Sequence, residues 1–360
     1  MNHEPLNGDS MSLYLYCLRE PSRCGRDKAG TAPENCSAPR VARGELSVTC
    51  PAPSGIKSQG VNGKDGVIIR AFDGIEAVVS EVNFDDFGEM QKKAQEDIHW
   101  IKEKALAHEM VVEEAMGLSA NVVAGVGDPG PACAEAASAG RPASAQPATA
   151  CPAFVPSSGR GEQGRRVVSY RRPDLSPVIP IKFGVIFNTN ERLAHVISGQ
   201  SAAIRAAFDR IRAKQEWSVK LFLKDNQKFK DQVREQSKLF REKKNALAAL
   251  PAGMAYFMEE EFNGELESEC SRMLDEEAMK TFDELKTFAA EATLVKILDN
   301  KLTGRSERMI LNSAYLVANI HLPKFEKEVS KMRGKLAKRG FLLEQGGPWP
   351  AYHFTEFANE

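Results

Sequence analysis

Residues 178–187 form the most strongly β-prone apolar run of the chain. Pro177 precedes this run and a polar Asn-Thr-Asn stretch follows it, so the pattern predicts a buried strand. A buried strand needs neighbours on both sides because its backbone groups require hydrogen-bond partners. We expect these neighbours in the alternating run at 11–18 and in two further apolar runs at 67–72 and 75–82.

Asp73 and Gly74 separate the last two of these runs. Both residue types accept the positive φ angles of a type I′ turn, and Asp-Gly between two apolar runs is a strong hairpin signal. The sequence therefore predicts a tight hairpin at this point.

Two longer segments in the first half have the spacing of amphipathic helices. The first is expected to start at the capping side chains of 83–86 and to end at Gly117, and the second covers 191–214. The predicted order is strand, hairpin, helix, strand, helix. This order indicates an α+β sandwich of one sheet and two helices, close to the ferredoxin-like arrangement.

The second half of the chain repeats this mixture of strands and helices. The predicted strands are 216–223, 293–298, 309–319 and 340–344, and the predicted helices are 225–250, 258–290 and 323–338. The second predicted domain is therefore also α+β, and its two longest helices are joined by Pro251-Ala-Gly.

These two long helices carry opposite charge. Residues 224–244 contain eight basic and four acidic residues, whereas 259–291 contain twelve acidic and three basic ones. We expect an antiparallel helical hairpin at 225–290 with ion pairs along its rim. Each exposed pair contributes only about 0.3–0.5 kcal/mol, so the apolar stripe must provide most of the stability.

The length of 360 residues is enough for about two domains with separate cores. We predict an N-terminal domain at 11–214 and a C-terminal domain at 215–345, followed by a tail at 346–360. Segments rich in Pro, Gly, Ala and Ser bury too little apolar surface to fold. We expect disorder at 1–10 and two disordered insertions at about 20–65 and 119–174.

The formal net charge of −1 argues against a nucleic-acid-binding protein, which needs a basic surface. No apolar run is long enough for a membrane span or a signal-peptide core, so we expect a cytoplasmic protein. The seven cysteines show no zinc spacing and no Cys-x-x-Cys motif, and are expected to be free thiols.

No catalytic set, cofactor motif or metal site stands out along the chain. His99 and His108 are nine residues apart on one predicted helix, so they lie on roughly opposite faces and cannot share a metal. We interpret both as surface histidines. No Gly-x-Ser-x-Gly elbow is present, and we expect neither a cofactor nor an enzymatic activity.

Aromatic residues gather in the Pro-rich C-terminal tail at Trp349, Tyr352 and Phe354. Such a cluster either docks back onto its own domain or anchors a partner protein. We take these three residues, together with Tyr14 and Tyr16, as the candidate partner-binding residues.

Six sequence blocks, found in both halves of the chain, resemble the GvpL/GvpF family of gas vesicle proteins. The blocks are MSLYLYC at 11–17, DGIEAVVSE at 73–81, IHWI at 98–101 with His108-Glu109, VIPIKFG at 178–184, EWSVK at 216–220 and GPWPAYHF at 347–354. No single block is decisive, but all six occur in the family's order. The two insertions depart from the family pattern and fall between the predicted elements.

The resemblance implies a non-enzymatic accessory or minor structural protein of gas vesicle assembly. It also implies that the protein associates with gas vesicles and binds the hydrophobic shell protein and other accessory proteins. Two alternatives remain open from the residues: an enzyme with an active site between the domains, and an adaptor built on the helical hairpin.

Overall fold

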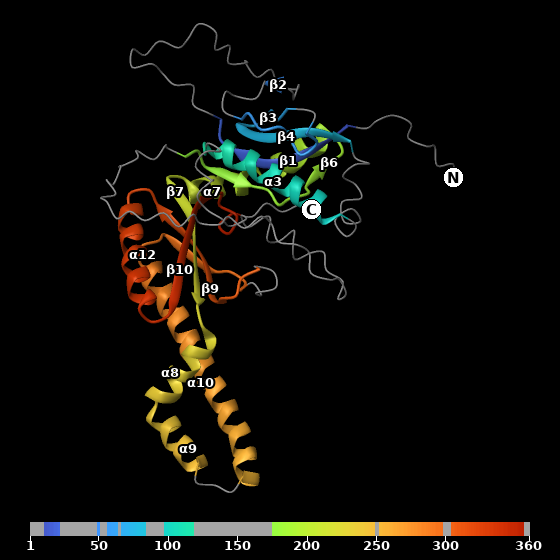
Figure 1. Ribbon diagram of the computed structural model, residues 1–360. Helices are drawn as coiled ribbons and strands as arrows, with labels where there is room; N and C mark the ends of the chain where they lie inside the picture. The colour runs from blue at the N-terminus through green and yellow to red at the C-terminus, as the bar shows by residue number, and fades with distance from the viewer. Residues whose placement is uncertain are drawn as a thin grey trace, which may run out of the picture. The chain divides into compact units, whose positions relative to one another are not determined.

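The structure is a computed structural model that describes residues 11–21, 49–50, 56–63, 66–83, 97–118, 175–248, 252–297 and 304–355. The contacts divide the chain into two compact units: Met1–Ala213 with Pro350–Glu360, and Lys214–Trp349. The chain is a mixed helix and sheet protein with two antiparallel sheets (Figure 1). Residues 1–10 and 119–174, where disorder is predicted, lie outside the described residues.

The first unit contains the larger sheet, in the order β2-β3-β4-β1-β5, with β6 also paired to β1. Its strands are β1 (Met11–Arg19), β2 (Thr49–Cys50), β3 (Ile68–Phe72), β4 (Ile75–Asn83), β5 (Val178–Pro180) and β6 (Ile186–Phe187). Strand β1 is central, because it pairs with β4 on one side and with β5 and β6 on the other. The ferredoxin-like description of this sheet stays a prediction.

The prediction of one continuous buried strand at 178–187 is wrong. The segment forms two short strands, β5 and β6, which pair with β1 alone and lie at the edge of the sheet. Gly184 between them has a φ of 96°, and Pro180 has no N–H for the ladder. The chain therefore turns away from β1 between the two strands.

The predicted hairpin is confirmed. Strands β3 and β4 pair in register from Phe72 and Ile75 outward. Asp73 and Gly74 have φ angles of 47° and 75°, the positive values that a type I′ turn requires.

Helix α3 covers Ile98–Met116, and the earlier part of the predicted helix, at 84–96, lies outside the described residues. The Asp97 side chain accepts hydrogen bonds from the N–H groups of His99 and Trp100, so Asp97 is the N-cap. The predicted end is confirmed, since Gly117 adopts the left-handed conformation with φ 96°.

The single helix predicted at 191–214 is two helices, α6 (Asn190–Gly199) and α7 (Ser201–Ile211). The Ser-Gly-Gln-Ser sequence at 198–201 interrupts them, because glycine and serine are weak helix formers. Helix α6 contacts β3 and β6, and α7 contacts β5.

The end of the first predicted insertion is part of the first unit. Strand β2 pairs with β3, and Val61 is buried. Residues 56–63 are ordered instead, because hydrogen bonds to Glu114 on α3 and to Tyr16 on β1 hold them in place, while 22–48, 51–55 and 64–65 lie outside the described residues.

The second unit contains a four-stranded sheet in the order β10-β7-β9-β8. Its strands are β7 (Lys214–Leu223), β8 (Glu291–Leu294), β9 (Arg308–Ala318) and β10 (Phe341–Trp349). All four were predicted, but β10 extends to Trp349 and so includes residues assigned to the tail. Helix α12 (Leu322–Ala337) and the C-terminal half of α10 (Ala252–Lys286) share one core with this sheet.

Two shorter helices pack along the N-terminal half of α10 (Figure 1). The helix predicted at 225–250 is divided into α8 (Asn226–Gln236) and α9 (Lys238–Ala248), because Ser237 is extended with ψ 123°. Lys230 pairs with Glu267 and Lys243 with Glu265, so ion pairs of the predicted kind link the helices.

Candidate functional site

A cluster of buried polar side chains lies between β1 and α3 in the first unit. Tyr14 and Tyr16 alternate with leucines along β1 and face α3, where they meet His108. The Tyr14 hydroxyl is 3.0 Å from Nδ1 of His108, and the rings of Tyr16 and His108 have centroids 5.5 Å apart. All three side chains are completely buried.

The partners of His108 define its tautomer. Its Nε2 lies 3.1 Å from the Ile181 carbonyl oxygen, which only accepts, so Nε2 carries the proton. Nδ1 then accepts from the Tyr14 hydroxyl, whose oxygen in turn accepts from the Gly184 N–H at 3.1 Å. Burial lowers the pKa of His108 to about 4, so the imidazole is neutral at physiological pH.

These hydrogen bonds fix the backbone of 181–184, the connection between β5 and β6. His108 and Tyr14 each bind one backbone group of that connection. The cluster therefore links α3, β1 and the turn between β5 and β6.

Tyr16 holds the segment 56–63 through a second set of bonds. Its hydroxyl donates to Oγ of Ser80 at 3.0 Å and accepts from the Val61 N–H at 2.8 Å. A Cβ at Gly60 would lie 2.1 Å from that Oγ, so only glycine allows this approach. Burial raises the pKa of Tyr16 to about 12, which keeps the phenol protonated.

The C-terminal segment 350–355 belongs to the same unit and binds α3. The Tyr352 hydroxyl donates to Oε2 of Glu109 at 2.9 Å, while Phe354 and Thr355 are buried. Burial first, and then the neighbouring Glu109 carboxylate, hold the pKa of Tyr352 well above its usual value. The two ends of the chain thus contribute to one polar cluster.

Trp349 belongs to the second unit, where it ends β10. Its indole Nε1 donates to Oγ of Ser218 at 3.0 Å, and its side chain is buried. Of the five candidate partner-binding residues, four belong to the first unit and Trp349 belongs to the second. All are buried or half-buried within the chain, so partner binding through them stays a prediction.

Sequence reasoning missed His108 and Glu109 as members of this cluster. His108 was interpreted as a surface residue, but it is fully buried, whereas His99 is exposed. A signal was available, because His108 follows Ile101 and Ala105 and precedes Val112 at the spacing of one helix face. Two hydrogen bonds to distant segments, one at each ring nitrogen, allow a histidine to occupy that apolar stripe.

The described residues contain no group of three or more histidine, cysteine or acidic side chains that could hold a metal ion. Within the same residues, no helix has the length and apolar character needed to cross a membrane. Cys17 and Cys270 are buried free thiols.

An exposed apolar edge lies in the second unit. Strand β8 ends its sheet and pairs with β9 alone among the described strands. The chain continues along β9 through the bond of the Val295 N–H to the Asn312 carbonyl oxygen. Leu294 and Ile297 are each 50% exposed on this edge.

The family model described as "Gas vesicle synthesis protein GvpL/GvpF" matches residues 12–123 and 165–356, which is most of the chain. The chain belongs to the GvpL/GvpF family. A comparison with curated proteins finds no match.

Two solved structures are similar to this GvpL/GvpF family protein over nearly their whole length. Gas vesicle protein GvpF from Anabaena sp. PCC7120 has a TM-score of 0.56 and 17% identity, and the match covers 97% of this chain and 100% of that one. GvpF from Microcystis aeruginosa has a TM-score of 0.51 and 15% identity, with coverages of 96% and 99%. These likenesses support the same mixed helix and sheet fold.

Proposed function

We propose that this protein is a non-catalytic accessory or minor structural protein of gas vesicle assembly that binds the hydrophobic shell protein. Membership of the GvpL/GvpF family supports the assembly role. The proposal further places the protein in the cytoplasm in association with gas vesicles, where it also binds other accessory proteins.

The single observation that carries the binding step is the exposed edge at β8. An edge strand presents backbone donors and acceptors to an incoming strand, and exposed apolar side chains beside it add affinity. Leu294 and Ile297 provide such side chains. A shell subunit held on this edge is kept from aggregating until it joins the growing wall, which is a chaperone-like role.

The experiment has a cellular and a biochemical arm. Deletion of the gene in a gas-vesicle-forming host is expected to abolish or deform the vesicles, and purified protein is expected to retain the shell subunit in a pull-down. Intact vesicles together with no retention of the shell subunit would reject the proposal.

The edge itself is tested by the double variant Leu294→Glu and Ile297→Glu. Charges on the edge disfavour strand addition, so we expect a loss of shell-subunit retention of about tenfold or more. Ile320→Glu is the matched control, because Ile320 is 80% exposed in the same unit but follows β9 outside the edge. Equal losses in both variants would assign the effect to general surface charge.

A further inference from the structure

Helix α10 exposes all four of its methionines, which are between 37% and 59% accessible. They are Met254, Met258, Met273 and Met279. Methionine usually fills gaps in cores, and methionines gathered on a surface are characteristic of binding sites that adapt to several partners. Four exposed methionines on one helix therefore need an explanation.

The four side chains share one side of the helix. At 100° per residue they fall within about 120° of one another. Residues outside this arc are buried: Leu266 and Cys270 share a core with α8 and α9, and further along α10 Leu274 and Phe282 pack on the sheet. Phe262 falls inside the arc but is buried against Phe240 of α9. We name the exposed side, defined by the four methionines, the outer face of α10.

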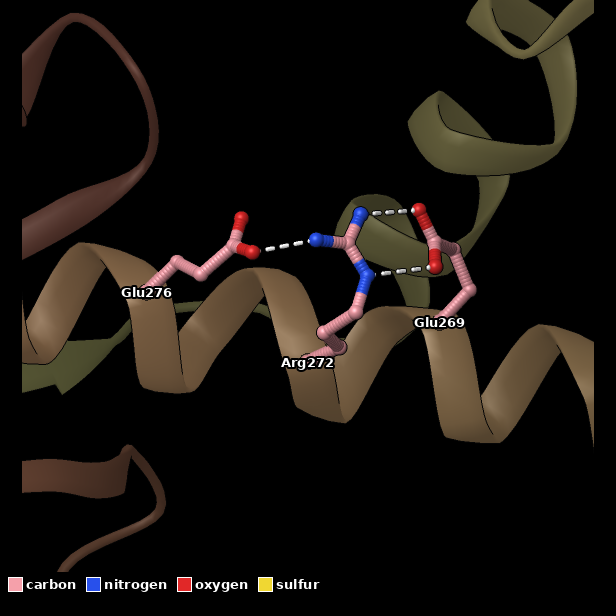
Figure 2. Close-up of polar contacts among 3 residues, drawn as sticks. All are labelled: Glu269, Arg272 and Glu276. Carbon is pink, nitrogen blue, oxygen red and sulfur yellow. Dashed lines mark hydrogen bonds and ion pairs between the residues drawn. The ribbon is translucent and has the colours of Figure 1, made fainter.

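The outer face is acidic. At 100° per residue its arc contains five acidic and two basic residues, so its formal charge is 2 − 5 = −3. They are Glu261, Glu265, Glu269, Glu276 and Asp283, with Arg272 and Lys280. Figure 2 shows that one of the three cations of α10 is already paired, because Arg272 lies between Glu269 and Glu276. Arg272 Nε and Nη2 donate to the two Glu269 oxygens at 2.9 and 2.6 Å, and Nη1 donates to Glu276.

We propose that the outer face of α10 binds a basic amphipathic helix of a partner protein. The flexible thioether side chains pack against the partner's apolar stripe, while exposed carboxylates on the same face, such as Glu261 and Asp283, pair with flanking lysines or arginines. From Met254 to Met279 the face is about 37 Å long, which matches a partner helix of about 20–25 residues. A second copy of this face is a poor occupant, since two strongly acidic helices repel each other.

This inference goes beyond the proposed function and does not depend on it. It names a surface and a partner chemistry, whichever protein carries the helix. Failure of the test below leaves the assembly role and the β8 edge untouched, because those are measured by vesicle formation and shell-subunit retention.

The test uses the full-length protein and a fluorescent synthetic 20-residue peptide of leucine and lysine at helical spacing. Fluorescence anisotropy is expected to give a Kd in the micromolar range at 0.1 M salt and weaker binding at 0.5 M salt. A leucine and glutamate peptide of the same pattern is expected to bind at least tenfold more weakly. Equal binding of the two peptides would overturn the proposal.

The surface is located with variants. Met254→Gln, Met258→Gln, Met273→Gln and Met279→Gln combined are expected to weaken binding of the basic peptide at least tenfold while circular dichroism stays unchanged. Leu294→Gln with Ile297→Gln is the control, because it removes exposed apolar side chains from another element of the same unit. The proposal is wrong if both variants bind equally, or if sedimentation shows a dimer that the methionine variant alone abolishes.

Discussion

At the scale of single residues, His108 is neutral and fully buried because each of its ring nitrogens has a partner. Nε2–H donates a hydrogen bond to the Ile181 carbonyl oxygen and Nδ1 accepts one from the Tyr14 hydroxyl, so neither nitrogen needs water. Its pKa of about 4 follows from this burial, since the protonated form would be a desolvated charge.

Replacing this side chain measures the contribution of the cluster. His108→Leu removes both hydrogen bonds and leaves the Ile181 carbonyl without its donor, so we expect the free energy of unfolding at pH 7 to fall by about 2 kcal/mol. Urea denaturation provides the measurement. His195→Leu, at an exposed position on α6, is the control and is expected to change the free energy of unfolding by no more than about 0.5 kcal/mol. Similar losses in the two variants would contradict a special role for the cluster.

Glu113 gives a pH-dependent prediction. It lies on α3 four residues after Glu109, and burial raises its pKa from the usual 4.5 to about 7. Between these values the folded protein binds a proton that the unfolded chain does not, so this group's contribution to stability increases as the pH falls from 7 to 4.5. Above pH 7 the buried carboxylate is charged and destabilises the fold.

Glu113→Gln should therefore stabilise the protein at pH 8, by up to about 3 kcal/mol, and make no difference at pH 4. Denaturation curves across this range give the result, with Glu103→Gln at an exposed position of α3 as the control. His108 acts in the opposite direction, because the unfolded chain gains a proton between pH 6.5 and 4 that the folded protein does not. If Glu113→Gln increases the free energy of unfolding by the same amount at every pH, the pKa of Glu113 is not raised by burial.

At the scale of elements, short polar signals define where helices and strands stop. Asp225 caps α8 by accepting from the Lys228 N–H at 2.9 Å, and Gly117 closes α3. The Asp73-Gly74 turn sets the register of β3 against β4. These signals act within a few residues and do not depend on the rest of the fold.

The turn provides a prediction at this scale. Gly74→Val places a β-branched residue at a φ of 75°, so we expect a loss of about 1–3 kcal/mol in the free energy of unfolding. Gly199→Ala is the matched control, because that glycine lies in α6 with open space around it and has no left-handed φ. It should be neutral or stabilise the protein by up to about 1 kcal/mol. If thermal denaturation shows no difference between the two variants, the turn does not define the hairpin.

At the scale of the whole molecule, the first unit is built from both ends of the chain. Residues 350–355 return to it after the second unit, and Tyr352 binds Glu109 on α3. The second unit, Lys214–Trp349, is thus inserted between two parts of the first.

Truncation tests this arrangement. A chain that ends at Trp349 loses the buried Phe354 and the bond from Tyr352, and we expect the first unit to lose about 3 kcal/mol or more. A chain that ends at Thr355 keeps these contacts and serves as the control. Hydrogen exchange of the α3 amides reports the change in the first unit. Equal protection of α3 in both truncated chains would show that the C-terminal segment adds no stability.

The sequence alone determined the features that depend on nearby residues: the hairpin turn, the strands β1, β7 and β9, and the opposed charges that pair Lys230 with Glu267. It also carried the family resemblance. Alternation, turn residues and charge spacing are local, so they can be recognised without the fold.

The tertiary structure alone decided which groups pair with the buried polar residues and where the apolar run at 178–187 breaks. His108 is buried because Tyr14 and Ile181, which lie 94 and 73 residues away, satisfy its nitrogens. The same contacts hold the turn that splits the predicted strand. Bonds between such distant segments leave no periodic trace in either one, and that is the physical reason the sequence could not reveal them.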